Sequence, residues 1–484
     1  MAMAREVARM VPGNRRLRGV LAAAACAALF AGAVTAATRA EGPDGPPGAP
    51  GAAAPTATVP AAAPTPTPWT PPPAAPARSA PPPGDWPGFG PVTADPVRVR
   101  TGDGDCLNVR YLPGLSGQGA PRECAAEGTL LWLWGEPADA DGETWRYALG
   151  RGWVAVRYTE PAPGARQGFG PFASVTAVAG ALGEWSQVAT ADSGGTVSRS
   201  PWLPFNAGWS GVRPSPLSPS GRFVAAGQFD PDMAGGAVFD TATGEAAELN
   251  GALPVMWGPG DRLAVRIPAV CDACPGGYGW TSPPFREVRP FAGPASWNLA
   301  WLPDGSGVVT WVPGAGLRVE TLEGGERTIP LAVAPEEWPG ELTVSPSGTK
   351  ALLVPFTGPV RVVDLESGAV REFARPAPGF VGGRCGGSPG LTSAWADEET
   401  VAWHELLQGD GGNGIVVANL RTGERRVYPF VNVLDLRPAG AGLLTFTVQD
   451  YAGEKGELPA MSWLLDPRTG DAWPAAGGMF GQWR

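Results

Sequence analysis

The chain has 484 residues, of which 43% are hydrophobic and 17% charged, so it is long enough for two or three domains with a sizeable core. Its 70 Gly and 56 Pro favour many short strands over long helices. The formal net charge is −10, and no basic stripe interleaved with aromatic residues stands out. These features exclude nucleic acid as an expected partner, because its phosphates would have to be neutralised by a basic surface.

The N-terminus predicts export. Arg15-Arg-Leu-Arg18 precedes an apolar run from Gly19 to Ala37, as in a signal peptide. Val34-Thr-Ala36 supplies the small residues that suit signal-peptidase cleavage, and the run is almost long enough to span a bilayer. Residues 1–40 are interpreted as a signal peptide or a retained membrane anchor. The Ala-rich composition favours the cleaved signal, and in both cases the rest of the chain lies outside the cytoplasm.

Residues 41–94 are predicted to be a disordered linker. Residues 41–91 contain 18 Pro, together with many Ala, Thr and Gly, and cannot bury enough apolar surface to fold. Such a segment tends to polyproline II and could act as a spacer through a cell wall.

Residues 95–162 are predicted to form a small β-barrel. Short runs rich in β-branched and aromatic residues are separated by polar turns. These runs begin at Val97, Leu107, Thr129, Thr144 and Gly152.

This segment resembles the bacterial Src-homology-3-type domain. The matching residues, in the order typical of that family, are Leu107-Asn-Val-Arg110, Gly128-Thr129, Trp145 with Tyr147, Gly152-Trp-Val154 and Tyr158. Tyr111-Leu-Pro-Gly114 departs from the Ser-Gly-Pro that the family prefers. The resemblance implies contact with peptidoglycan or peptide. The candidate groove residues are Tyr111, Trp132, Trp145 and Trp153.

Two cysteines, Cys106 and Cys124, flank an extended loop within this segment. In an exported chain, two cysteines in one small barrel predict a disulfide. Closing a loop of about 17 residues would stabilise the fold by roughly 3 kcal/mol in the chain-entropy model.

From Leu217 onward a turn–strand–strand–turn phrase recurs. Leu217-Ser-Pro-Ser-Gly221 has variants that end at Gly260, Gly305, Gly348, Glu399 and Gly440, spaced 39 to 51 residues apart. A period near 40–45 residues with several strands per unit is typical of propeller blades. Trp301-Leu-Pro-Asp-Gly305 and Asp240-Thr-Ala-Thr-Gly244 resemble the two turns of the WD-repeat-like propellers of the TolB type.

The resemblance implies an all-β propeller over residues 163–484. Six anchors predict six blades, and residues 167–216 could build a seventh. Pro, Asp and Gly in the repeated turns are expected to be structural, because each suits a turn position.

The candidate chemistry is sparse. The single histidine, His404, would have to serve any Ser–His–Asp triad, and no Gly-x-Ser-x-Gly motif supplies the serine. Cys271, Cys274, Cys385 and His404 could share one propeller face, and three Cys with one His form a valid zinc set. A disulfide among the three cysteines is favoured over zinc, because export favours oxidation. No metal or cofactor is therefore expected.

The sequence predicts a non-enzymatic extracytoplasmic binding or scaffold protein of the cell envelope. The barrel would contact peptidoglycan or peptide, and the propeller would offer a face for a protein or glycan. The expected partners are cell-wall glycan or peptide, or another envelope protein. The membrane is contacted only through the N-terminal segment, and a monomer is expected.

The alternative is a secreted, glycosidase-like hydrolase with a propeller active site. Function on the propeller is expected where the repeats differ: residues 271–280, 379–393 and 449–459.

Overall fold

The computed structural model describes most of the chain after residue 88. The described residues are 89, 91–102, 104–115, 121, 123–182, 185–205, 212–230, 233–267, 276–291, 293, 298–312, 314–331, 340–355, 358–375, 392–406, 413–430, 433–448 and 460–484. Within these ranges the regular structure is β-strands with two 3₁₀ turns, Val156–Tyr158 and Pro259–Asp261, and no α-helix. The predicted all-β class is confirmed.

Within the described ranges, none of the helical segments is long and apolar enough to cross a membrane. The predicted signal or anchor (1–40) lies outside them, as does the linker up to residue 88.

The first seven strands form a small unit. A five-stranded antiparallel sheet has the order β6-β5-β4-β1-β7, and β2 pairs with β3 separately. A bridge between Arg110 and Trp153 joins the β2–β3 hairpin to β6. Each run predicted here falls in a strand, whereas the Src-homology-3 resemblance stays a prediction. The strands are β1 (Asp95–Val99), β2 (Leu107–Val109), β3 (Glu123–Ala125), β4 (Leu130–Ala140), β5 (Glu143–Ala148), β6 (Gly152–Ala155) and β7 (Thr159–Pro161).

The remaining described strands form seven antiparallel sheets. In the first, β8 (Ser174–Leu182), β9 (Trp185–Asp192) and β10 (Val197–Leu203) are joined by the C-terminal β34 (Met479–Trp483). The second holds β11 (Phe223–Asp230), β12 (Met233–Asp240) and β13 (Ala246–Glu248).

The other five sheets each contain four consecutive strands. They are β14 (Leu253–Gly258), β15 (Arg262–Ile267), β16 (Gly277–Thr281) and β17 (Arg289–Pro290); β18 (Leu299–Trp301), β19 (Gly307–Val312), β20 (Gly316–Thr321) and β21 (Glu326–Ile329); β22 (Glu341–Val344), β23 (Lys350–Val354), β24 (Val360–Asp364) and β25 (Val370–Phe373); β26 (Ser393–Trp395), β27 (Thr400–Leu406), β28 (Asn413–Asn419) and β29 (Arg425–Phe430); β30 (Val433–Gly440), β31 (Leu443–Val448), β32 (Met461–Leu465) and β33 (Ala472–Gly477).

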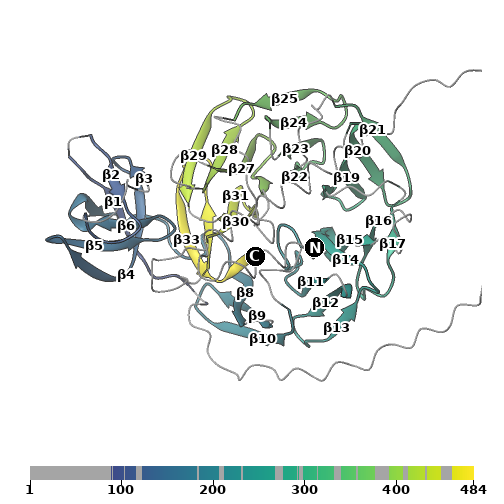
Figure 1. Ribbon diagram of the computed structural model, residues 1–484, viewed down its shortest axis with the longest axis horizontal. Coiled ribbons are helices and arrows are strands. Elements are labelled where there is room, and N and C mark those ends of the chain that lie inside the picture. The colour runs from purple at the N-terminus through teal and green to yellow at the C-terminus, as the bar shows by residue number, and fades with distance from the viewer. Residues whose placement is uncertain are drawn as a thin grey trace, which may run out of the picture. The chain divides into compact units, whose positions relative to one another are not determined.

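Successive sheets pack face to face around a ring, which is the arrangement of a β-propeller (Figure 1). The first strands lie next to one another, with β14 beside β18, β18 beside β22, β22 beside β26 and β26 beside β30. Residues 167–216, from which a further blade could be built, supply β8, β9 and β10.

The two ends of the repeat array meet in one sheet. β34 pairs with β8, so that Trp483 lies opposite Val175 and Met479 opposite Val178. The backbone N–H of Arg484 donates to the carbonyl of Ser174 at 3.0 Å. The last strand of the chain therefore completes the first sheet and closes the ring.

The repeated turns have the structural roles expected of them. In the second turn of the β22–β25 sheet, the Asp364 carboxylate accepts the backbone N–H of Ser367 at 2.7 Å, and Gly368 takes a φ of 74°. The Ser367 N–H lowers the pKa of Asp364. In the first turn of the preceding sheet, Asp304 accepts the N–H of Ser306 at 2.9 Å.

Tryptophans of the repeat join neighbouring sheets. Trp257 Nε1 donates to the carbonyl of Pro216 at 2.7 Å, and Trp301 Nε1 donates to that of Met256 at 3.3 Å. A large apolar ring with one N–H donor can thus both fill the space between sheets and satisfy a backbone acceptor.

The small unit packs against the last sheet of the ring. Trp132 Nε1, on β4, donates to the carbonyl of Ala472 on β33 at 3.0 Å. Trp132, Tyr147 and Leu149 share one buried cluster with Phe430 and Trp463. A Cβ at Gly150 would lie 3.3 Å from Val448 Cγ1 on β31, so the turn after β5 approaches the last sheet closely.

The chain before and after the small unit is held against the same sheet. Phe89 is buried in the shared cluster, and Pro91 forms a bridge with Ala476 of β33. On the exit side, Arg166 pairs with the buried Asp466 at 2.8 Å, and Trp473 Nε1 donates to the carbonyl of Gly168 at 2.9 Å.

The closing strand gives a test of the ring. Replacing Trp483 by Ala should lower the free energy of unfolding by about 3–5 kcal/mol, measured by urea titration with circular dichroism. The substitution removes a ring that contacts Phe169 and donates to Thr445 Oγ1 at 2.8 Å. The exposed Tyr111 is the matched control, and Tyr111→Ala should change stability by no more than about 0.5 kcal/mol. Equal losses in the two variants would contradict the role assigned to β34.

Candidate functional site

The four predicted groove residues lie in different environments. Tyr111 is exposed, with 47% of its surface accessible. Trp132 is buried against the ring, and Trp145 is buried with its Nε1 donating to the carbonyl of Ala140 at 3.2 Å. Trp153 is half-buried and meets the Tyr147 ring edge-on at 5.6 Å.

Two of the four groove residues are therefore unavailable to a surface ligand in this structure. Trp132 differs from the expectation because it packs against β33, far away in sequence. Trp145 differs because its ring is buried, with 2% of its surface exposed, and its Nε1 is bonded to a backbone carbonyl.

An exposed apolar loop, residues 111–115, follows β2. Its Leu112 is 42% and its Leu115 56% exposed, alongside Tyr111. Of the five large hydrophobic side chains exposed in the described part of the chain, three belong to this loop. Such clustering of apolar side chains on a soluble surface marks an interaction site more often than scattered residues do.

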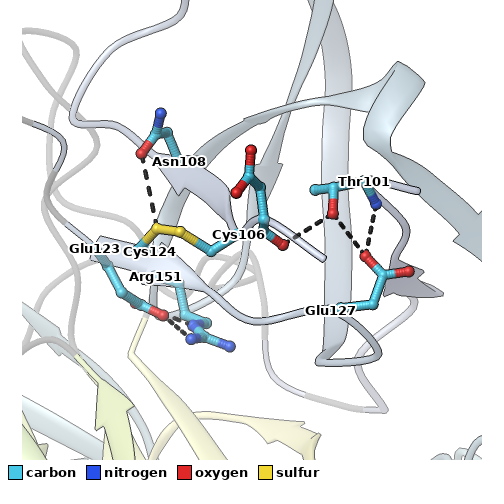
Figure 2. Close-up of a disulfide and its surroundings, with 8 residues drawn as sticks. Thr101, Cys106, Asn108, Glu123, Cys124, Glu127 and Arg151 are labelled. Atoms are coloured by element: carbon cyan, nitrogen blue, oxygen red, sulfur yellow. Dashed lines mark hydrogen bonds and ion pairs between the residues drawn. A yellow bond between two sulfur atoms is a disulfide. The ribbon is translucent and has the colours of Figure 1, made fainter. Parts of the chain in front are cut away.

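The predicted disulfide is confirmed and encloses this loop. Cys106 and Cys124 are bonded, with their Cα atoms 5.3 Å apart, and connect the start of β2 to β3. Figure 2 shows the bond beside Glu123 and Arg151. Arg151 Nε donates to Glu123 Oε2 at 3.1 Å, and burial lowers the pKa of Arg151 to about 10.

Thr101 holds the chain on either side of the disulfide, through Asp105 before Cys106 and Glu127 after Cys124 (Figure 2). The Glu127 carboxylate accepts both the backbone N–H and the hydroxyl of Thr101 at 2.7 Å. The N–H of Thr101 lowers the pKa of Glu127. The Thr101 hydroxyl shares its one proton with the carbonyl oxygen of Asp105, 2.8 Å away, and so helps to hold the chain just before Cys106.

Two further contacts hold the apolar loop. At its start, Arg110 and Trp153 exchange backbone hydrogen bonds of 2.9 and 2.8 Å. At its end, the Leu115 N–H donates to the Asp141 carboxylate. Asp141 and Gly142 form the β4–β5 turn with positive φ values of 52° and 76°. The loop is thus exposed on its apolar side and restrained on its backbone.

Of the three cysteines and one histidine that could have shared a face of the propeller, the structure describes only the histidine. Cys271, Cys274 and Cys385 lie outside the described residues, as do residues 271–275, 379–391 and 449–459. His404 is described, on β27, and is buried. Within the described ranges, His, Cys, Asp and Glu side chains form no group of three that could hold a metal ion.

His404 is a buried neutral imidazole. Burial and, to a smaller extent, the positive charge of Arg375 together lower the pKa of His404 to about 4. Neither ring nitrogen has a hydrogen-bond partner among the residues that the structure describes. Its neighbour Glu405 binds Arg375 Nε at 3.2 Å and accepts from Trp403 Nε1 at 3.0 Å.

Glu341 is the second unusual titratable group. It begins β22 and is 5% exposed. Burial raises the pKa of Glu341 to about 7, and the positive charge of Arg213 opposes that rise. No pattern in the sequence distinguished this carboxylate, because Glu341 is not part of a paired-carboxylate motif.

Glu341 and His404 give stability opposite dependences on pH. Between about pH 6.5 and 4, His404 is protonated in the unfolded chain but neutral in the folded protein, so acid weakens folding through this group. Between about pH 7 and 4.5, Glu341 is protonated when folded but ionised when unfolded, so acid strengthens folding through this group.

Removing either group should expose the effect of the other. When the pH falls from about 7 to about 5, the unfolding free energy of Glu341→Gln should decrease by roughly 2–3 kcal/mol more than that of wild type, because the stabilising protonation of Glu341 is lost. The unfolding free energy of His404→Gln should decrease by roughly 2 kcal/mol less than that of wild type, because the buried imidazole is gone. Urea titrations at the two pH values measure both. If each variant kept the wild-type pH dependence, the two groups would titrate as in the unfolded chain.

Removing the disulfide should release the loop it closes. The double variant Cys106→Ser, Cys124→Ser should lose about 3 kcal/mol of unfolding free energy, because the unfolded chain regains loop entropy. Reduced wild-type protein is the control and should unfold at the same urea concentration as the variant. Titration of both thiols in oxidised wild-type protein would contradict the bond.

No family model and no curated protein matches the chain. Among solved structures it is similar to TolB from Acinetobacter baumannii, with a TM-score of 0.34 and 12% sequence identity over 59% of this chain and 75% of that chain.

Proposed function

We propose that this protein is an extracytoplasmic, non-enzymatic binding protein of the cell envelope. Its ring would be a seven-bladed propeller that serves as a scaffold, and its small unit would be a Src-homology-3-type barrel. The observation that carries the proposal is the apolar loop, residues 111–115, which exposes Tyr111, Leu112 and Leu115 on a restrained backbone. A restrained surface loses little conformational entropy on binding.

The rest of the chain supports this function. The positively charged flank and apolar run at the N-terminus suit export, and the Pro-rich segment suits a spacer. A disulfide also fits an oxidising compartment. Because the small unit and the ring share one buried cluster, the loop would be presented at a fixed place relative to the ring.

Retention on cell-envelope material tests the proposal. Purified wild-type protein should be retained on insoluble wall or envelope fractions and should not turn over a panel of glycosides. Leu115→Asp should weaken retention at least about tenfold, because it puts a charge into the apolar surface. Val427→Asp is the matched control, because Val427 is 53% exposed on β29 and lies outside the loop. Failure of the wild-type protein to be retained would overturn the proposal.

The alternative, a secreted hydrolase, is favoured by one observation. A buried carboxyl with a pKa of about 7, such as Glu341, suits a general acid at neutral pH. If the glycoside panel gave turnover, Glu341→Gln should abolish it. That outcome would replace the binding function by an enzymatic one.

A further inference from the structure

We propose that the inner edge of the ring binds a small zwitterion, a molecule with one primary ammonium group and one carboxylate, between Glu341 and Arg213. The ammonium binds the Glu341 carboxylate, and the carboxylate of the ligand binds the Arg213 guanidinium. This site lies on the ring and not on the small unit. It therefore goes beyond the function proposed above and does not depend on the loop at residues 111–115.

The fold places both residues at the inner edge of the ring. Glu341 is the first residue of β22, the innermost strand of its sheet. The backbone of Arg213 pairs with Met256 in a parallel bridge, and its N–H donates to the carbonyl of Val255 at 2.8 Å. Both of these partners belong to β14, which is the innermost strand of another sheet (Figure 1). One strand, β18, lies beside both β14 and β22, so the two charged residues are separated by a single intervening sheet.

The protein itself neutralises neither charged group. Glu341 is 5% exposed, whereas Arg213 is exposed. Among the residues that the structure describes, neither the carboxyl nor the guanidinium has a hydrogen-bond or ion-pair partner. The positive charge of Arg213 nevertheless acts on Glu341, so the two groups are near each other without being bonded. A buried carboxyl without a partner is costly when ionised, and a ligand with both complementary charges would satisfy the carboxyl and the guanidinium together.

A small solute can reach the buried carboxyl. The oxygens of Glu341 are not among the completely buried polar atoms without a partner, so they retain some contact with solvent. Polar side chains also lie on the neighbouring inner strands. Thr343 Oγ1 is 3.1 Å from Ser393 Oγ on β26, and the buried Asn298 immediately precedes β18. A few polar groups among apolar ones are typical of sites that orient a small molecule.

Other charges on the surrounding strands do not replace the ligand. In the described part of the chain, the strands that pack against β22 are β18, β19, β23 and β26, and their only charged residue is Lys350. Lys350 is at the opposite end of β23 from the partner of Glu341 and contacts Glu398 at 4.0 Å. Arg375, after β25, and Glu405, on β27, form an ion pair with each other at 3.2 Å.

Binding of an ammonium would change the protonation of the site. Without a ligand, burial raises the pKa of Glu341 to about 7. An ammonium stabilises the ionised carboxylate, so binding below pH 7 releases one proton from Glu341 to the solvent. Only about a tenth of the protein has Glu341 ionised at pH 6, against most of it at pH 8. The ligand should therefore bind about tenfold more tightly at pH 8 than at pH 6.

Calorimetric titration with simple amino acids tests the proposal on the full-length protein. The probes are glycine, 4-aminobutanoate and 6-aminohexanoate, in which chains of different length separate the two charges. The controls are n-butylamine and butanoate, which carry one charge each. At pH 8, at least one of the amino acids should bind at least about tenfold more tightly than either control. The same amino acid should bind about tenfold more weakly at pH 6.

Variants locate the binding. Glu341→Gln keeps the size of the side chain; it should weaken binding at least about tenfold and remove the pH dependence between 6 and 8. Arg213→Gln should also weaken binding at least about tenfold. The matched controls Glu366→Gln and Arg327→Gln alter exposed charges away from the inner edge and should stay within about twofold of wild type. Circular dichroism of each variant confirms that it is folded.

Three outcomes would overturn the proposal. One is that none of the three amino acids binds at millimolar concentration. Another is that n-butylamine binds as tightly as the best amino acid, which would identify a site for a cation alone. The third is full binding by folded Glu341→Gln or Arg213→Gln. None of these outcomes bears on the loop at residues 111–115, whose function is tested separately by retention on envelope material.

Discussion

The ring depends on the pairing of β34 with β8. Each sheet has an apolar face that must be covered by its neighbour, so an open row of sheets would leave two faces exposed to water. The pairing of Trp483 with Val175 brings together residues from the two ends of the array. The C-terminal strand therefore lets every one of the seven sheets have both faces covered. The small unit depends on this closure too, because its docking surface is the sheet that precedes β34.

The close packing of the sheets also constrains the charged groups of the interior. Sheets packed face to face leave little water between them, so a charge in that space needs a partner or a shifted pKa. Arg375 forms an ion pair with Glu405, and Arg437 Nε forms one with Asp435 Oδ2 at 2.8 Å. Glu341 and His404 instead shift towards their neutral forms. Because their shifts act on stability in opposite directions, the wild-type protein is expected to vary less with acid than either group alone would suggest.

Local features were predictable from the sequence, whereas long-range contacts were not. The turns around Asp304 and Asp364 depend on residues only a few positions away, so the local sequence pattern was enough to predict them. The disulfide was predictable because Cys106 and Cys124 lie in one small unit of a chain whose N-terminus predicts export. The burial of Trp132 was not, because its acceptor on Ala472 is 340 residues away. The sheet of β8, β9 and β10 precedes the first repeat anchor at Leu217 and takes its fourth strand from the C-terminus, so the count of anchors alone favoured six blades.

The position of Phe89 and Pro91 determines where mechanical force would enter the molecule. If the chain before residue 89 is tethered, tension reaches the fold first at the buried Phe89 and then at the Pro91–Ala476 bridge on β33. The buried Phe89 ring resists that tension together with the cluster that joins the small unit to the last sheet. A load on the tether would therefore be shared by the small unit and the ring before it could pull on β1, and the loop at residues 111–115 would lie outside the path of the force.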